Sequence, residues 1–171
     1  MAADLSELPA HAPLRVLMVC MGNICRSPTA QGVLEKMAAD AGLAERVRVD
    51  SAGTYDGHAG APPDERAQAH AARRGYDLSG HRARPLRSRD FMAFDLVLVM
   101  DAHNERAARA LCPPAQQHKL RRLTDFCTRA RAHEVPDPYS GGPAGFEHAL
   151  DLIEDACAGL LAALKKGGAF Y

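Results

Sequence analysis

Residues 16–28 read Val16-Leu17-Met18-Val19-Cys20-Met21-Gly22-Asn23-Ile24-Cys25-Arg26-Ser27-Pro28. The nearly continuous apolar run over residues 14–19 is typical of a short strand that is buried on both faces. Ser27 is a suitable N-cap and Pro28 a suitable first helical residue. The stretch therefore predicts a strand, a tight loop and a helix that ends near Gly42.

The rest of the chain continues this alternation of strands and helices. Further strands are predicted at residues 46–50, at 96–100 and, more weakly, at 120–126. Helices are predicted at 64–74, with Asp64 as cap, at 102–111, and at the carboxyl end, where apolar residues recur every three or four positions: Phe146, Leu150, Ile153, Cys157, Leu160 and Leu164. We expect a three-layer α/β/α sandwich with a central four-stranded parallel sheet, of the Rossmann-like or flavodoxin-like type.

Length and composition place limits on the organisation and on the partners. With 171 residues, we expect a flexible leader over residues 1–13 and one domain over residues 14–171. A formal net charge of zero gives no general indication of nucleic acid or membrane binding, and no apolar run is long enough to span a bilayer. The leader lacks the apolar core of a signal peptide, so reduced cysteines in the cytoplasm are the expected setting.

The loop after the first strand combines a thiol with groups that bind anions. Cys20 is expected at the mouth of a helix, where unpaired amides and the helix dipole favour a thiolate. Gly22 and Asn23 allow the loop to turn its amides inward as a nest. Arg26 offers a planar fork for two phosphate oxygens, and Ser27 can donate a hydrogen bond to the thiolate. These residues predict a site for a tetrahedral dianion, with Cys20 placed for in-line attack at phosphorus.

Other interpretations of this loop remain open at this point. Cys20 and Cys25 could form a metal pair, although no Cys/His cluster at the usual spacing completes four ligands. A phosphate-binding loop without chemistry would not need the thiol. The Gly-Lys-Ser/Thr ending of a nucleotide-binding P-loop is absent.

Thiolate chemistry at phosphorus also needs a proton donor for the leaving oxygen. The best candidate is Asp137, which Pro136 and Pro138 hold in a rigid, extended loop. Tyr139 beside it can pack on an aromatic leaving group. An Asp-Pro segment usually forms only a turn. Together with the Cys20 loop, however, it makes Asp137 a candidate general acid.

The segment from Cys20 to Ser27 has the form Cys-x-Gly-Asn-Ile-Cys-Arg-Ser, and Asp137-Pro138-Tyr139 follows far downstream. This pattern strongly resembles the low-molecular-weight protein tyrosine phosphatases, and the resemblance covers residues 14–164. It implies hydrolysis of phosphotyrosine through a cysteinyl-phosphate intermediate, with phosphotyrosine proteins as partners, no cofactor or metal, and a monomer or weak homo-oligomer.

The same resemblance implies roles for particular residues. Cys20 would be the nucleophile, Arg26 the phosphate clamp and Asp137 the acid and then the base. Cys25 would be the redox partner that forms a reversible disulfide with Cys20. The substrate would be bound by loop residues and two tyrosines, and the loop supported by a small polar network: Met21, Gly22, Asn23, Ile24, Cys25, Ser27, Tyr55 and Tyr139 for binding, Ser51 and His81 for support.

Three positions bear on specificity within that family. Ile24 stands where arginine phosphatases of the family carry threonine, which favours phosphotyrosine. Gly57 stands where an aromatic residue is expected, so either Tyr55 fills the place or the wall of the cleft is open. Ser140 replaces a second aromatic residue that often follows the Asp-Pro-Tyr motif.

Two competing functions remain. A thioredoxin-linked arsenate reductase of the same fold needs two further cysteines on a mobile loop, whereas Cys112 and Cys127 are far apart in the sequence. A non-catalytic phosphate-binding or redox-sensing module would not need Cys20, Arg26 and Asp137 together.

Overall fold

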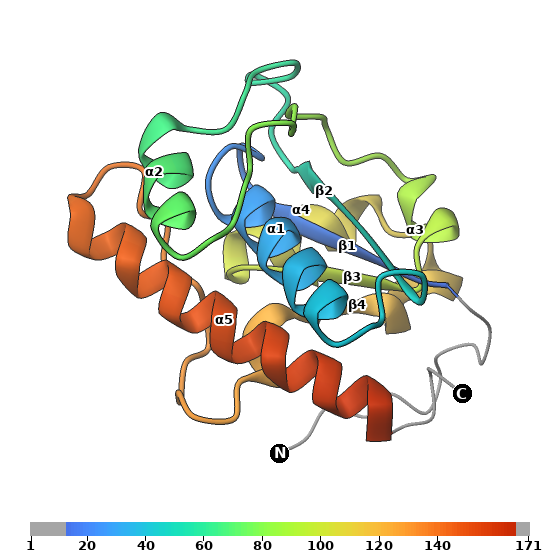
Figure 1. Ribbon diagram of the computed structural model, residues 1–171. Helices are drawn as coiled ribbons and strands as arrows, with labels where there is room; N and C mark the ends of the chain where they lie inside the picture. The colour runs from blue at the N-terminus through green and yellow to red at the C-terminus, as the bar shows by residue number, and fades with distance from the viewer. Residues whose placement is uncertain (1–12, 167–171) are drawn as a thin grey trace.

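The structure, a computed structural model, describes residues 13–166, so that the predicted leader lies outside the described residues except for Pro13. All strands of its sheet are parallel, in the order β2-β1-β3-β4 (Figure 1). The strands are β1 (Leu14–Cys20), β2 (Val47–Gly53), β3 (Leu96–Val99) and β4 (Leu120–Arg122). The helices are α1 (Arg26–Asp40), α2 (Glu65–Arg73), α3 (Asp90–Ala93), α4 (Ala102–Leu111) and α5 (Pro143–Lys166), with 3₁₀ helices η1 (Pro114–Lys119) and η2 (Leu123–Phe126).

The helices cover both faces of the sheet, which confirms the predicted three-layer fold. Val16 and Met18 of β1 pack into the core on the side of α1 and α5. Leu17 and Val19 point to the opposite face, into the core under α3 and α4. Because side chains alternate along a strand, a run of apolar residues can serve both cores at once.

The chain reverses its direction of sheet growth at β1. From β1 it moves outward to β2, and then crosses back to add β3 on the other side of β1. Ligands of such sheets bind beyond the carboxyl ends of the strands at this switch point. The loop that follows β1 (residues 21–25) and leads into α1 lies there, and we call it the phosphate loop (Figure 1).

Four details of the predicted secondary structure were wrong. Strand β2 runs from Val47 to Gly53, beyond the predicted end at residue 50, so that Ser51 lies within the strand. Helix α1 begins at Arg26 with Cys25 as its N-cap residue and no capping side chain, so Ser27 is not the cap and Pro28 is not the first helical residue. The fourth strand ends at Arg122, where η2 begins, instead of reaching Phe126. The short elements α3 and η1 were not predicted.

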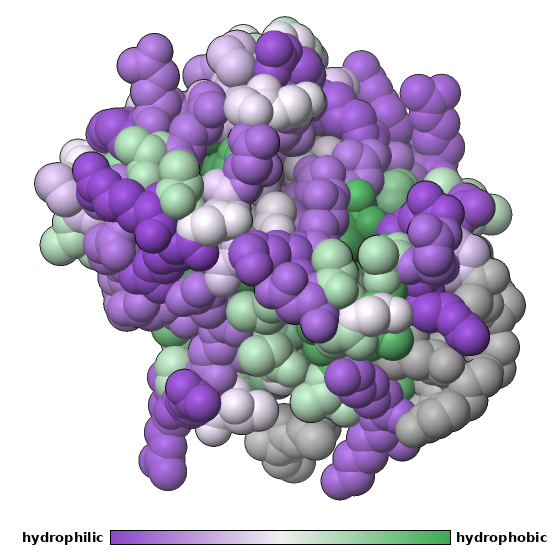
Figure 2. Space-filling model, viewed as in Figure 1, coloured by the Kyte–Doolittle hydropathy of each residue, from purple (hydrophilic) through white to green (hydrophobic). Residues whose placement is uncertain are grey.

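Two further predictions about the helices agree with the structure. Asp64 caps α2, since its side chain accepts hydrogen bonds from the amides of Arg66 and Ala67. Helix α5 buries the apolar positions of its repeating pattern, whereas the face of the molecule shown in Figure 2 is mostly hydrophilic. Between residues 13 and 166, no helix is long and apolar enough to cross a membrane.

Candidate active site

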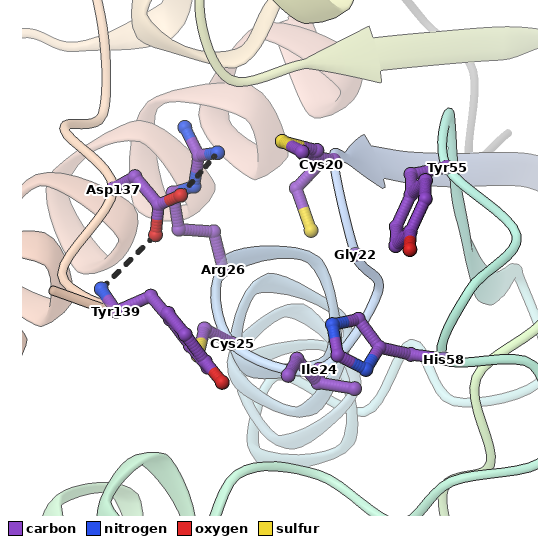
Figure 3. Close-up of a pocket in the computed structure, with 10 residues that line it drawn as sticks. Cys20, Gly22, Ile24, Cys25, Arg26, Tyr55, His58, Asp137 and Tyr139 are labelled. Carbon is purple, nitrogen blue, oxygen red and sulfur yellow. Dashed lines mark hydrogen bonds and ion pairs between the residues drawn. The ribbon is translucent and has the colours of Figure 1, made fainter.

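A cavity of about 140 Å³ lies over the phosphate loop, at the carboxyl ends of the strands. Figure 3 shows Tyr55 and His58 on one side of it, Asp137 and Tyr139 on the other, and Cys20 between them. Segments far apart in the sequence thus meet around one thiol. The cavity is lined by Cys20, Met21, Gly22, Ile24, Cys25, Arg26, Tyr55, His58, Asp137 and Tyr139.

The sulfur of Cys20 is held by two groups of the loop and of α1. Its Sγ lies 3.0 Å from the hydroxyl of Ser27, and the backbone amide of Asn23 donates to it at 3.3 Å. The Ser27 oxygen already accepts a hydrogen bond from Asn23 Nδ2 at 2.8 Å, so its own hydrogen is available for the sulfur. Ser27 therefore serves the thiol instead of capping the helix.

Asn23 fixes the shape of the phosphate loop. It has a positive φ of 57°, a conformation that asparagine tolerates better than most residues, and it is fully buried. Its amide nitrogen also donates to Ser51 Oγ at 3.0 Å, and its side-chain oxygen accepts from the backbone amide of Arg84 at 2.9 Å. With both amide hydrogens and the oxygen engaged, the side chain leaves the loop little freedom to move.

A second layer of polar groups holds Asn23 from behind. Ser51 Oγ donates to Gln31 Oε1 at 2.7 Å and lies 3.5 Å from His81 Nδ1. The other ring nitrogen of His81, Nε2, is 2.9 Å from the carbonyl oxygen of Asn23 and must donate there. Burial lowers the pKa of His81 below its ordinary value, despite the hydrogen bond to Asn23. A neutral imidazole therefore carries its hydrogen on Nε2 and braces the strained residue.

Glycine at position 53 lets the end of β2 approach this loop. A Cβ there would lie 2.6 Å from the carbonyl oxygen of Met21 and 3.1 Å from the amide of Asn23. Without that Cβ, the backbone after Gly53 can approach closely. The amide of Thr54 donates to the carbonyl of Cys20, at the end of β1, and the amide of Tyr55 donates to the carbonyl of Met21 in the loop. Strand β2 thereby delivers Tyr55 to the rim of the cavity.

Arg26 is oriented by groups that bind one nitrogen of its guanidinium. Its Nη1 donates to Asp101 Oδ2 at 2.6 Å and to the carbonyl of Val135 at 2.9 Å. Burial raises the pKa of Asp101, but the hydrogen bonds from Arg26 and the Asn104 amide outweigh it and hold the pKa below its usual range. An ionised Asp101 thus fixes a buried arginine at Nη1, so that Nη2, 3.6 Å from Asp137 Oδ2, is directed at the cavity and can bind an oxyanion there.

Asp137 reaches the same cavity from the loop before α5. Its Oδ2 lies 3.6 Å from Nη2 of Arg26, and its Oδ1 accepts from the amide of Tyr139 at 3.1 Å. The carboxylate is 46% exposed, so water can reach it. Its position over the anion-binding fork suits exchange of a proton with a bound ester or with water.

On the side of the cavity opposite Asp137, Tyr55 takes the place of the aromatic residue expected at position 57. The ring of Tyr55 lies directly against Gly57, where an added Cβ would be only 2.1 Å from the ring. His58 stands between the two tyrosines, with its ring centroid 5.8 Å from that of Tyr55 and 6.5 Å from that of Tyr139. Tyr55 thus supplies the aromatic wall, and glycine at 57 makes room for it.

Each residue predicted to bind or react lies in or under this cavity. Sequence reasoning missed four contributors: His58, Gln31, Arg84 and the role of Asp101. Two of them left a signal, because Asp101 follows a buried strand at the same rim and Gln31 lies one helical turn after Ser27. His58 and the backbone amide of Arg84 gave none.

Two alternative interpretations gain no support from the geometry. In the described part of the chain, no group of three or more His, Cys, Asp or Glu residues is placed to hold a metal ion. Cys112 belongs to the core under α3 and α4, whereas Cys127 packs against the core on the other face of the sheet. Neither lines the cavity, so neither is placed to relay a disulfide from Cys20.

Comparison with known proteins places this site in a family. The family model of low molecular weight phosphotyrosine protein phosphatases matches residues 15–169. A low molecular weight protein-tyrosine-phosphatase of Streptomyces coelicolor is 44% identical over 155 residues, 89% of this chain and 94% of that protein. A Bacillus subtilis protein of the same description is 37% identical, over 90% of this chain and 97% of that protein.

The solved structures agree. A protein tyrosine phosphatase from Entamoeba histolytica, with Hepes in its active site, superposes with a TM-score of 0.88 at 40% identity. The match covers 90% of this chain and 98% of that one.

Proposed function

The chain belongs to the low molecular weight phosphotyrosine protein phosphatase family, and we propose that it hydrolyses phosphotyrosine in proteins through a phosphoryl group carried on Cys20. One observation carries this proposal: a thiol, an oriented arginine and an exposed carboxylate line a single cavity that has aromatic walls. A module that only bound phosphate would need the loop and Arg26, but neither the thiol nor the acid.

In the first step, the Cys20 thiolate attacks the phosphorus of the bound ester. The guanidinium of Arg26, together with the amides of the phosphate loop, holds the oxygens whose charge develops in the transition state. The bond from phosphorus to the phenolic oxygen breaks, and the Asp137 carboxyl group gives its proton to that oxygen. The products are a dephosphorylated tyrosine side chain in the protein substrate and a cysteinyl phosphate.

In the second step, a water molecule attacks the phosphorus of the cysteinyl phosphate. Asp137, now a carboxylate, takes a proton from this water, and the sulfur leaves as a thiolate that the Ser27 hydroxyl stabilises at 3.0 Å. Inorganic phosphate is released and the enzyme returns to its starting state.

Matched phosphopeptides test the proposed substrate class. Hydrolysis of a phosphotyrosine peptide, without added metal ion, should exceed that of a phosphoserine peptide of the same sequence by on the order of 10²-fold in kcat/KM, because a short alkyl ester cannot fill the space between the aromatic walls. Phosphate release is measured at initial rate. Equal rates on the two peptides would refute a tyrosine phosphatase.

The aromatic wall can be tested at Gly57. Gly57→Ala should displace the Tyr55 ring, since the added methyl would overlap it, and KM for a phosphotyrosine peptide should rise by about 2–10-fold, the usual worth of one aromatic contact. Tyr55→Ala should have a similar effect. Gly80→Ala is the matched control, because a Cβ there meets nothing within 4 Å. An unchanged KM in both cavity variants would show that Tyr55 does not contact the substrate.

Cys25 is the proposed protector of the nucleophile under oxidation. Burial, and then the nearby carboxylate of Asp64, raise the pKa of the Cys25 thiol, so it does not compete with Cys20 as an anion. Peroxide would oxidise the Cys20 thiolate to a sulfenic acid, and the Cys25 sulfur would then displace water to form a disulfide. Mass spectrometry after peroxide treatment should find the Cys20–Cys25 disulfide, whereas sulfonate alone on Cys20 would count against it.

We propose a cytoplasmic enzyme that acts as a monomer or weak homo-oligomer, with one domain over residues 14–171. Its family supports phosphoprotein substrates.

A further inference from the structure

Arg66, in the first turn of α2, links the two loops that form the site. Its Nη2 donates to the carbonyl oxygen of Tyr139 at 2.9 Å, in the loop that carries Asp137. Its Nε and Nη2 also donate to the carboxylate of Asp64, at 3.2 and 3.0 Å. The guanidinium therefore spans from the cap of α2 to the backbone just after the candidate acid.

The Asp64 end of this link is anchored to the phosphate loop. The backbone amide of Asp64 donates to the carbonyl of Ile24 at 2.8 Å. Burial raises the pKa of Asp64, but the hydrogen bonds from Arg66 and from the amides of α2 hold it below its ordinary value. The Asp64 carboxylate is ionised and caps a helix, and the backbone of the same residue is bonded to the phosphate loop, so it is a fixed point for Arg66.

The Tyr139 end is held by its ring as well as by its carbonyl. The guanidinium carbon of Arg66 lies 5.5 Å from the ring centroid of Tyr139 and 4.8 Å from that of Phe146. Phe146 is itself buried on α5 and stacked on His70, with centroids 5.4 Å apart. Arg66 thus lies between a buried ring and an exposed one, and a lysine could not provide both the flat contact and the forked hydrogen bonds.

The position of Tyr139 sets the position of the acid. The Tyr139 amide donates to Asp137 Oδ1 at 3.1 Å, and Pro138 between them restricts the backbone. A shift of the Tyr139 backbone would therefore move the carboxylate relative to Arg26, its partner at 3.6 Å across the cavity. Misplacement by about 1 Å is enough to cost a large part of a catalytic contribution.

We propose that Arg66 is a positioning residue for the general acid: it ties the Asp137 loop to the phosphate loop through Asp64, so that acid and nucleophile keep one fixed geometry. This inference rests on the proposed phosphatase function. It assigns Arg66 no contact with the reacting atoms, and Arg66 does not line the cavity. Its loss should therefore appear as weaker protonation of the leaving group, with the phosphate-binding fork left intact.

The test compares leaving groups. Arg66→Met keeps the apolar stem but removes the fork; Arg66→Lys keeps the charge. For Arg66→Met, kcat/KM should fall by about 10–10²-fold with phenyl phosphate, part of the full worth of an acid. It should fall by less than about threefold with p-nitrophenyl phosphate, whose phenolate leaves with little protonation. Arg66→Lys should recover only part of the loss.

Controls separate positioning from general damage. Arg73→Met, at an exposed arginine of the same helix, should leave both substrates unaffected. An equal loss with both substrates in Arg66→Met and Arg66→Lys, or no loss in either, would overturn the inference. If Arg66→Met does not fold, as judged by circular dichroism, Arg66→Lys alone decides, by the ratio of its loss with phenyl phosphate to its loss with p-nitrophenyl phosphate. Failure of the proposed function is distinct, because the unaltered protein would then hydrolyse neither ester.

Discussion

Replacing Cys20 with serine is expected to lower kcat for p-nitrophenyl phosphate by on the order of 10⁶-fold, the usual cost of losing a covalent nucleophile. The structure gives the reason. Ser27 and the Asn23 amide are arranged to stabilise an anion at position 20, but neither can remove a proton from a hydroxyl. A serine there would stay neutral and would be a poor nucleophile.

The same variant should still bind the anion. Arg26 and the amides of the loop are untouched, so inorganic phosphate, which forms no bond to the sulfur, should bind Cys20→Ser with an affinity close to that of the unaltered protein, as measured by calorimetry. Cys127→Ser, at a half-buried cysteine outside the cavity, is the matched control and should keep its full rate. Substantial turnover by Cys20→Ser would rule out attack by this thiol.

Replacing Asp137 with asparagine is expected to lower kcat by about 10²–10⁴-fold, the typical size of an acid–base contribution. Asparagine has nearly the same shape and can still accept the hydrogen bond from the Tyr139 amide, so the loop should keep its conformation. It cannot give a proton to the leaving oxygen or take one from water. The defect should therefore be larger for phenyl phosphate than for p-nitrophenyl phosphate.

Asp56→Asn is the control for this prediction. Asp56 is an exposed carboxylate in the loop after β2, near Tyr55 but outside the lining of the cavity, and its loss should change kcat by less than about twofold. If Asp137→Asn lost less than tenfold on phenyl phosphate, the acid would have to be sought elsewhere.

The central sheet and the phosphate loop were predictable from local sequence. The strand before Cys20 is apolar at successive positions because both of its faces are covered, and this pattern is visible without a structure. The site followed from chemistry at short spacing: a thiol, an arginine and a serine within eight residues. Asp137, which lines the cavity, was proposed as the acid because the chemistry requires a proton donor and two prolines flank it.

What could not be predicted depends on contacts between distant residues. Serine is a residue type that often caps helices, but the hydroxyl of Ser27 is bonded to the sulfur of Cys20 instead. Only the folded loop brings the two groups together. The fourth strand is short because the chain turns into η2 at Leu123. The ring of Tyr55 against Gly57 and the link from Arg66 to Tyr139 both depend on loop geometry that no periodic pattern reports.

The most direct test of a phosphoryl group on Cys20 is to trap it. The protein is mixed with excess p-nitrophenyl phosphate, quenched by denaturant within milliseconds and digested, and the peptides are examined by mass spectrometry. One phosphoryl group is expected, located on Cys20 and absent from Cys20→Ser. A phosphoryl group on another residue, or steady release of phosphate with no protein-bound phosphoryl group at any time, would contradict it.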